Sequence, residues 1–243
     1  MAWIQISTDC AGMNMQVDFQ VIVPQKRGPH SALYLLHGYK GDGTQWIRRT
    51  QIEFFVNDMN LAVVMPNGHN SWWRKLSNGM DYFGYVTDEL ASKSESWFDV
   101  GAGKYIGGWS MGGYGALLAG LTFPEKYSHV IGLGAAVCGK EHVAAAMPEV
   151  SEMIFGKESE HEQNGADLFA LAQRAVKRGK PLPKIYLACG RQDMLFAENE
   201  RFASHLEQLG YDVTFVPTDG AHDWVYCNDA LKSALKWLPE GRA

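Results

Sequence analysis

The sequence predicts an α/β protein in which a mostly parallel, doubly wound sheet carries helices on both faces. Short, almost continuously apolar runs recur along the chain, as expected for strands that are buried on both faces of a parallel sheet. Helical patterns separate these runs, and such alternation is typical of parallel sheets with right-handed crossovers. The 243 residues contain no internal repeat and no low-complexity linker. We therefore expect a single domain over residues 1–243.

The predicted strands begin with residues 15–23, where apolar and polar residues alternate with the period of a half-buried strand. Buried runs then follow in order at residues 32–36, 61–65, 104–109, 130–135 and 184–189. Residues 212–216 return to alternation, which predicts a strand nearer the edge of the sheet.

Helices are predicted between these strands, at residues 45–59, 111–121, 166–177, 196–209 and 228–237. Residues 139–183 depart from the regular alternation, because they are polar, helical only in patches and long for a single crossover. In α/β enzymes an insertion of this kind often covers a functional site, so we interpret 139–183 as a small cap segment.

Composition excludes several classes of partner. The net charge is −5 and no run of lysine and arginine forms a basic patch, so we expect neither nucleic acid nor membrane partners. No apolar stretch approaches the roughly 20 residues that span a bilayer, and the first residues lack the regions of a signal peptide. We therefore expect a cytoplasmic protein, and the sequence leaves a homo-oligomer possible.

The sequence predicts neither a metal nor a cofactor. The four cysteines are scattered without C-x-x-C spacing, which suits neither a zinc site nor a disulfide framework. The chain also lacks an H-E-x-x-H motif and the glycine-rich motifs that bind nucleotides.

One serine lies among five glycines in the stretch GGWSMGGYGA at residues 107–116. This stretch follows a buried run and opens a predicted helix, which is the context of a G-x-S-x-G nucleophile elbow. A sharp turn strains the backbone of Ser110 and brings its flanking segments together, so Gly108 and Gly112 must lack side chains. Gly113 and Gly115 would let the helix pack closely. The glycines therefore predict that the hydroxyl of Ser110 projects over the strand ends.

A serine becomes an effective nucleophile when a base takes its proton and an acid orients that base. His222 is the candidate base, because it lies in the loop TDGAHDW between the last predicted strand and the last helix. Asp193 is the candidate acid at the end of strand 184–189, and it could also cap the helix that follows. Asp219 and Asp223 are competitors, although their closeness to His222 in sequence makes them less suited to face its Nδ1.

Two backbone N–H groups are candidates for an oxyanion hole. The first belongs to Met111 at a helix N-terminus, and the second belongs to Tyr39 in the loop YLLHGYKGD. His37 is expected to brace that loop rather than act as a base. Trp72 and Trp73 follow strand 61–65 and are expected near the carboxyl edge of the sheet, where they could line a substrate pocket or belong to the core.

With these motifs in place, the sequence resembles the putative-esterase family of α/β-hydrolases. This family includes esterase D (S-formylglutathione hydrolase), bacterial tributyrin and acetyl esterases, feruloyl esterases and mycolyltransferases. The resemblance covers nearly the whole chain and rests, in order, on LLHGYKGD, PNGHNSWW, GWSMGGYGA, GADLFALA, CGRQDMLFAENERF and GAHDWVYCNDAL. It implies an α/β-hydrolase fold with Ser110 as nucleophile, Asp193 as acid and His222 as base. It also implies that Tyr39 and Met111 supply the oxyanion donors.

Within the family, the chain looks most like the short-chain tributyrin and acetyl esterases. S-formylglutathione hydrolases usually carry an SGLTC-like stretch where this chain has HGYKG, and a histidine where Trp109 stands. Trp109 departs from the family pattern, and we expect it to pack under the elbow rather than to narrow the pocket.

The resemblance implies a serine carboxylesterase that cleaves acetyl- to butyryl-type esters through an acyl-enzyme. The expected partner is a small-molecule ester substrate, and an acylated sugar is one candidate. Two alternatives keep the same residues but change the reaction: thioester hydrolysis of S-formylglutathione, and acyl transfer to a sugar hydroxyl. A non-catalytic binding protein with the same fold is a third alternative.

Overall fold

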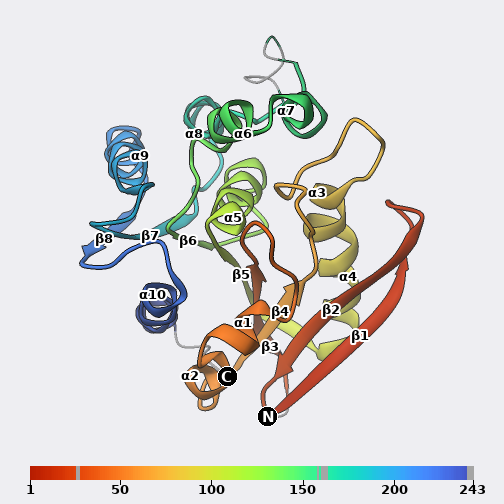
Figure 1. Cartoon of the computed structure of the whole chain (residues 1–243). Coiled ribbons are helices and arrows are strands. Elements are labelled where there is room, and N and C mark those ends of the chain that lie inside the picture. The colour runs from red at the N-terminus through yellow and green to blue at the C-terminus, as the bar shows by residue number, and fades with distance from the viewer. Residues whose placement is uncertain (26–27, 158, 160–163, 240–243) are drawn as a thin grey trace.

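The computed structural model describes the whole chain except residues 26–27, 158, 160–163 and 240–243. In the described residues, eight strands form one sheet in the order β1-β2-β4-β3-β5-β6-β7-β8 (Figure 1). The strands are β1 (Ala2–Cys10), β2 (Met15–Val23), β3 (His30–Leu36), β4 (Leu61–Pro66), β5 (Val100–Trp109), β6 (His129–Leu133), β7 (Lys184–Gly190) and β8 (Val213–Thr218). All neighbours pair in parallel except β2, which runs antiparallel to β1 and β4. The predicted α/β class with a mostly parallel sheet is confirmed.

The burial of the strands follows their apolar patterns. Every residue of β3 and β4 is buried, because helices cover both faces of the sheet at its centre. The alternating strand at 212–216 corresponds to β8, which forms one edge of the sheet as its pattern predicts. The sequence pattern does not predict β1. This strand forms the other edge and is mostly exposed, so it carries too few buried apolar residues to stand out.

The helices are α1 (Gln45–Arg49), α2 (Ile52–Val56), α3 (Tyr82–Gly84), α4 (Leu90–Phe98), α5 (Met111–Thr122), α6 (Gly139–Ala146), α7 (Pro148–Phe155), α8 (Leu168–Lys177), α9 (Phe196–Gln208) and α10 (Trp224–Trp237), with one π-helical turn, η1 (Tyr85–Glu89). The single helix predicted over 45–59 is divided into α1 and α2. Thr50 ends α1 in an extended conformation, and its hydroxyl donates to the carbonyl of Trp46. This side-chain bond competes with continuation of the helix. The α3–η1–α4 region was not predicted.

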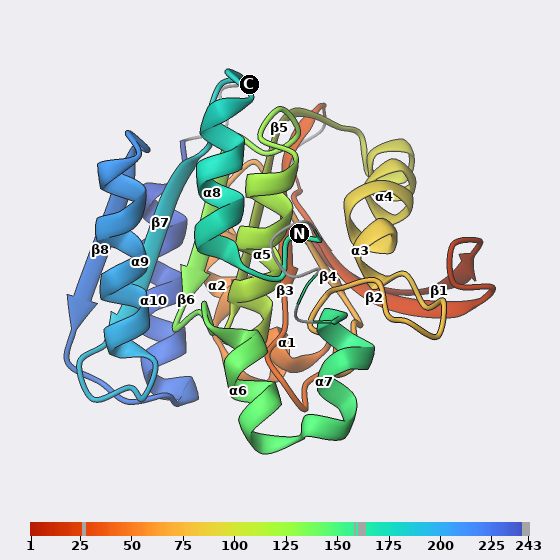
Figure 2. The same ribbon diagram turned by 90° about the horizontal axis from the view of Figure 1, so that it is seen from above.

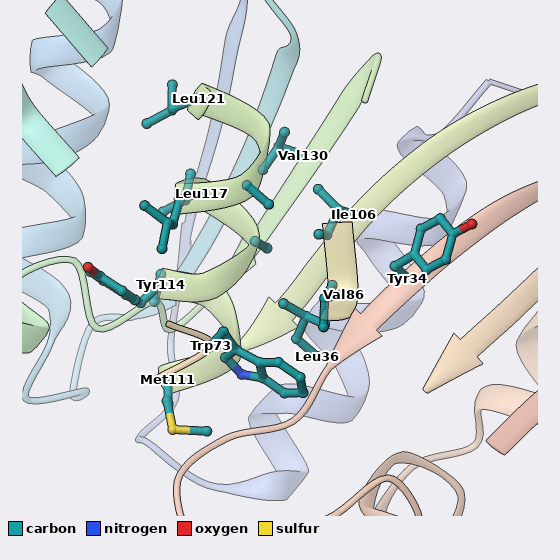
Figure 3. Packing of buried hydrophobic residues seen from close by; sticks show 14 of the residues in the cluster. Tyr34, Leu36, Trp73, Val86, Ile106, Met111, Tyr114, Leu117, Leu121 and Val130 are labelled. Atoms are coloured by element: carbon teal, nitrogen blue, oxygen red, sulfur yellow. The ribbon is translucent and has the colours of Figure 1, made fainter. Parts of the chain in front are cut away.

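Two layers of helices enclose the sheet. Figure 1 shows α4, α5, α8 and α9 over one face, and α1, α2 and α10 over the other. The buried apolar residues accordingly form two clusters, one on each face. Helix α5 is buried on all sides from Met111 to Leu121. Figure 3 shows Met111, Tyr114 and Leu117 along this helix, which packs over β5 and β6. Complete burial fixes α5, and with it the position of its N-terminus.

The described part of the segment predicted as a cap, 139–183, includes helices α6, α7 and α8, and residues 158 and 160–163 lie outside it. Helix α8 packs beside α5 as the crossover helix between β6 and β7. Helices α6 and α7 lie farther out, at the end of the molecule toward which the arrowheads of β6 and β8 point (Figure 2). Whether 139–183 acts as a cap stays a prediction.

The guanidinium of Arg74 ties this segment to the body of the domain. It donates to the carbonyls of Ile154 (3.0 Å) and Asn164 (3.3 Å) and to the hydroxyl of Tyr114 (2.9 Å). Tyr114 in turn donates to the carbonyl of Ala166. Arg74 is buried, so these bonds hold the chain on either side of the undescribed residues against α5. None of the helices in the described part of the chain has the length and apolarity that a bilayer crossing requires.

Candidate active site

The turn at Ser110 has the strained geometry that the sequence predicts. Ser110 has φ 56° and ψ −115°, and it stands between the end of β5 and the first residue of α5. A Cβ on Gly108 would lie 2.3 Å from the backbone of Gly112, and a Cβ on Gly112 would lie 2.1 Å from the carbonyl oxygen of Leu36. Neither neighbour can move, because both are backbone atoms. The two glycines are therefore required for the turn.

Backbone hydrogen bonds hold the strained residue in place. The N–H of Ser110 donates to Leu133 at the end of β6, and its carbonyl accepts from Tyr114 and Ala136. These partners belong to a neighbouring strand, the following helix and the loop after β6. The surrounding structure thus over-determines the conformation, which is the condition under which such strain persists.

The loops after β7 and β8 are joined where they leave the sheet. The N–H of Gly220 donates to the side chain of Gln192 (2.6 Å), and the N–H of Gln192 donates to the carbonyl of Gly220 (3.0 Å). Because β7 and β8 are adjacent and parallel, these bonds extend their pairing into the loops. The residues that follow in each loop, Asp193 and His222, are consequently brought together.

The structure brings Ser110, His222 and Asp193 into one hydrogen-bonded chain. His222 Nε2 lies 3.0 Å from Ser110 Oγ, and His222 Nδ1 lies 2.7 Å from Asp193 Oδ2. The Asp193 side chain is fully buried, while the imidazole is 21% exposed. The three residues come from elements that are far apart in sequence and adjacent in the sheet. This arrangement can move a proton from the hydroxyl to the imidazole.

The structure also separates the candidate acids. Asp193 Oδ1 accepts from the N–H of Leu195 (2.8 Å) and so stabilises the turn before α9, while Oδ2 meets His222. The Asp223 side chain caps α10 by accepting from the N–H of Tyr226. Of the competing aspartates, Asp193 therefore faces the imidazole and Asp223 serves a helix N-terminus.

The two candidate oxyanion donors lie on segments that meet at Ser110. Met111 is the first residue of α5, and Gly38, which precedes Tyr39, lies so close that an added Cβ would be 3.5 Å from Ser110 Cβ. Within the described residues, neither the N–H of Met111 nor that of Tyr39 donates to a protein acceptor. The hydroxyl of Tyr39 donates to Met147 Sδ at the α6–α7 junction, so that junction reaches this loop.

His37 braces the Tyr39 loop, as predicted. The ring is fully buried, and Nδ1–H donates to the carbonyl of Gly38 (2.8 Å). Nε2 accepts from the N–H of Gly68 (2.9 Å) in the loop after β4. A protonated imidazole would lose the second bond, because it has no lone pair to accept with. Burial lowers the pKa of His37 from 6.5 to about 4, so the neutral ring is the structural form.

We expect this histidine to make stability depend on pH. Because its pKa is 6.5 in the unfolded chain and about 4 in the folded one, the unfolded chain binds more protons between these values. Its contribution is therefore complete above pH 6.5 and is lost as the pH falls toward 4. The free energy of unfolding should be about 3 kcal/mol lower at pH 4 than at pH 7.5 from this group alone.

Urea unfolding of the wild type and of His37→Gln at both pH values measures this contribution. The variant lacks the titrating ring, so the wild type should lose about 3 kcal/mol more than the variant between pH 7.5 and pH 4. Equal losses in the two proteins would contradict the assignment.

Trp72 and Trp73, the predicted substrate-binding residues, are buried beneath the site. Trp73 is 1% exposed, donates from Nε1 to the carbonyl of His37 and packs against Gly115. Figure 3 shows it beside Met111. Trp72 is 6% exposed and packs against Tyr114. Trp73 thus supports the His37 segment, whereas Trp72 packs against α5 and α7. Contact of either indole with substrate stays a prediction.

Trp109 packs under the elbow, as predicted, but it also has a contact that the sequence did not reveal. Its indole stacks on the imidazole of His222, with ring centroids 4.3 Å apart and an interplanar angle of 21°. Residues 109 and 222 are joined by no motif, and only the arrangement of strands brings their rings together.

This fold and this site define a serine hydrolase of the α/β class. The sequence model of the family described as "Putative esterase" matches residues 10–238. The chain therefore belongs to the putative esterase family and is a carboxylic ester hydrolase.

Two kinds of relative agree with this assignment. An acetyl esterase of Caldicellulosiruptor saccharolyticus is 32% identical over 220 residues, which cover 85% of this chain and 82% of the relative. Among solved structures, the substrate-bound Staphylococcus aureus serine hydrolase FphF has a TM-score of 0.91 at 29% identity and 97% coverage of both chains. The S-formylglutathione hydrolase FrmB of the same organism has a TM-score of 0.88 at 29% identity, covering 97% of this chain and 98% of its own.

Proposed function

We propose that this protein is a serine carboxylesterase for short-chain acyl esters, of the acetyl to butyryl type, and that it acts through a Ser110–His222–Asp193 triad. The observation that carries the proposal is the continuous hydrogen-bonded chain from Ser110 Oγ through His222 to Asp193 Oδ2. A buried carboxylate oriented on Nδ1 leaves Nε2 free to accept the serine proton, which is the requirement for an activated hydroxyl.

The reaction proceeds in two acyl transfers. Ser110 Oγ bonds to the ester carbonyl carbon while its proton passes to His222 Nε2, and the carbonyl π electrons move to oxygen. When that oxyanion collapses, the ester C–O bond breaks, and the imidazolium gives its proton to the leaving alcohol. Water then attacks the acyl-enzyme with His222 as base, and the acid leaves as Ser110 regains its proton. Every step uses this chain's own groups and water.

The oxyanion is stabilised by the N–H groups of Met111 and Tyr39. Both groups lack a protein acceptor in the described residues and lie on segments that converge at Ser110. Their alignment costs nothing during the reaction, because the His37 bonds and the buried helix α5 hold the two segments in advance.

Preference for a short acyl chain is supported by the acetyl esterase relative and by the α6–α7 junction. Met147 Sδ at that junction accepts from the hydroxyl of Tyr39, so the junction lies against the loop that carries one of the proposed oxyanion donors. An apolar side chain at this loop would limit the number of methylenes that the acyl group can carry. An acetylated sugar would present the same short acyl group.

A second candidate is thioester hydrolysis of S-formylglutathione. The observation that favours it is the likeness to FrmB, which has a TM-score of 0.88 over 97% of this chain. Formyl is a smaller acyl group than acetyl, so a short-acyl pocket accommodates both substrates. The leaving group distinguishes the two candidates.

A substrate panel tests the proposal. We expect kcat/KM on p-nitrophenyl acetate and butyrate to exceed that on the octanoate by at least about 10-fold, because an unaccommodated methylene costs roughly 10- to 200-fold in discrimination. S-formylglutathione should be turned over more slowly than p-nitrophenyl acetate at equal concentration. Higher kcat/KM on S-formylglutathione would select the second candidate, and a preference for octanoate would contradict the short-acyl assignment.

A further inference from the structure

Besides the two hydrogen bonds of the triad, the imidazole of His222 has a stacking contact that the triad does not use. Nδ1 meets Asp193 and Nε2 meets Ser110, and both bonds lie in the plane of the ring. The stacking contact is to one face of the ring, where the indole of Trp109 lies 4.3 Å away between centroids and only 21° from parallel. The bond to Cβ and the two hydrogen bonds hold the ring at its edge, and the stacked indole supports one of its faces.

The indole itself is held rigidly. Trp109 is 4% exposed at the end of β5, directly before Ser110. A Cβ on Gly38 would lie 3.0 Å from its ring and one on Gly134 would lie 2.8 Å from it, so both glycines make room for the indole. Trp224 and Tyr226 of α10 close its remaining side, at centroid distances of 6.2 and 6.4 Å. The imidazole therefore rests on a fixed surface.

The stack also bears on charge. During each acyl transfer the imidazole becomes a cation, and the face of an indole carries negative potential that attracts a cation, most strongly when the pair is shielded from water. Trp109 is almost fully buried and the imidazole is 21% exposed, so water screens this attraction only in part. The attraction acts on the imidazolium and not on the neutral imidazole. It therefore stabilises the transition state for acyl transfer more than the ground state, and so lowers the barrier.

We infer that Trp109 is a positioning residue for the base: its indole fixes the plane of the His222 imidazole and stabilises the imidazolium that forms during acyl transfer. The inference rests on the proposed function, since it assigns His222 as the base. It adds a residue outside the triad and the oxyanion hole.

Trp109→Leu removes the aromatic face but keeps an apolar side chain. We expect kcat to fall about tenfold with KM nearly unchanged, because the loss affects the charged form of the base. The acid limb of the pH profile of kcat/KM should move to lower pH by about half a unit or more, since the cation is no longer favoured. Trp109→Phe keeps an aromatic face, so it should retain most of the wild-type kcat and most of the wild-type position of the acid limb.

The charged groups around the base remain constant in this comparison. Asp193 faces Nδ1, Asp219 and Asp223 flank His222 on its own loop, and Arg191 stands on the neighbouring loop before α9. None of them changes with residue 109. A displaced acid limb therefore reports the indole rather than a new neighbouring charge.

Trp46→Leu is the matched control. Trp46 is fully buried in the same apolar cluster and its ring pairs with Trp224, whereas the ring that stacks on His222 is that of Trp109. It should lower thermal stability as Trp109→Leu does, without moving the acid limb. An acid limb that stays in place in Trp109→Leu, or moves equally in Trp46→Leu, would overturn the inference while leaving the esterase assignment intact.

Fluorotryptophan gives a second test that does not depend on folding of the leucine variant. Biosynthetic fluorination weakens the negative potential of the indole face and preserves its shape. The fluorinated wild type should show an acid limb at lower pH, and fluorinated Trp109→Phe should match its unfluorinated form. An unshifted limb in the fluorinated wild type would count against the inference. The fall in kcat expected for Ser110→Ala tests separately whether Ser110 is the nucleophile.

Discussion

Replacement of Ser110 with alanine should lower kcat on p-nitrophenyl acetate by about 10⁶-fold. The reason is that the substitution removes the one atom that bonds to the acyl carbon, while the oxyanion donors and the base remain. Residual turnover then comes only from binding and polarisation of the ester, which alone give roughly 10³- to 10⁴-fold over water. Alanine keeps the Cβ and can occupy φ 56° at a cost similar to that of serine, so the fold should survive.

Three measurements define the outcome for Ser110→Ala. Steady-state turnover gives the loss in kcat, circular dichroism and thermal unfolding confirm the fold, and a fluorophosphonate probe followed by mass spectrometry reports the modified residue. Ser204→Ala is the control, because Ser204 is an exposed serine of α9. It should keep wild-type turnover and labelling. Turnover by Ser110→Ala within tenfold of the wild type would refute the proposed mechanism.

Asp193→Asn should lower kcat by about 10⁴-fold, through the tautomer of His222 rather than through loss of structure. An asparagine can present its NH₂ group to Nδ1, which then accepts, so the proton moves to Nε2. A protonated Nε2 cannot accept the proton of Ser110. The bond from the N–H of Leu195 to Oδ1 is available to the asparagine oxygen as well, so the turn before α9 has a partner in either case.

Asp223→Asn is the matched control for this prediction. Asp223 is the residue next to His222, and its side chain caps α10. Asparagine is as good an N-cap as aspartate, so stability should change little. Removal of this neighbouring charge should leave kcat within a few-fold of the wild type. A large loss in Asp223→Asn together with a small one in Asp193→Asn would reverse the assignment of the acid.

The nucleophile turn is where sequence reasoning succeeds most fully. Gly108 and Gly112 flank Ser110 at fixed offsets. A Cβ on Gly108 would meet the backbone of Gly112, four residues away, whereas a Cβ on Gly112 would meet the carbonyl of Leu36 on β3. The buried strands are predicted equally well from the sequence, because a strand covered on both faces must be apolar along its whole length. Such features depend on steric exclusion and on burial, and both leave a pattern in the order of residues.

The elements that were missed share a different property. The edge strand β1 is largely exposed. The break between α1 and α2 depends on a single hydrogen bond from the hydroxyl of Thr50, which leaves no mark in the helical pattern of apolar residues. Neither feature produces a long apolar pattern. In the site, the stack of Trp109 on His222 and the burial of Trp73 under the Tyr39 loop likewise have no signature in sequence.

By itself, the sequence determined the fold class, the serine at the elbow and the short set of candidate partners in chain order. Only the tertiary structure decided among those partners: adjacency of β7 and β8 brings Asp193 rather than Asp223 to the imidazole, and β5 carries Ser110 and Trp109 to the same ring. The physical reason is range. The need for glycine at position 108 arises from the backbone of Gly112, only four residues further along the chain. Ser110 and His222, in contrast, are 112 residues apart and meet only because the strand order of the sheet closes that distance.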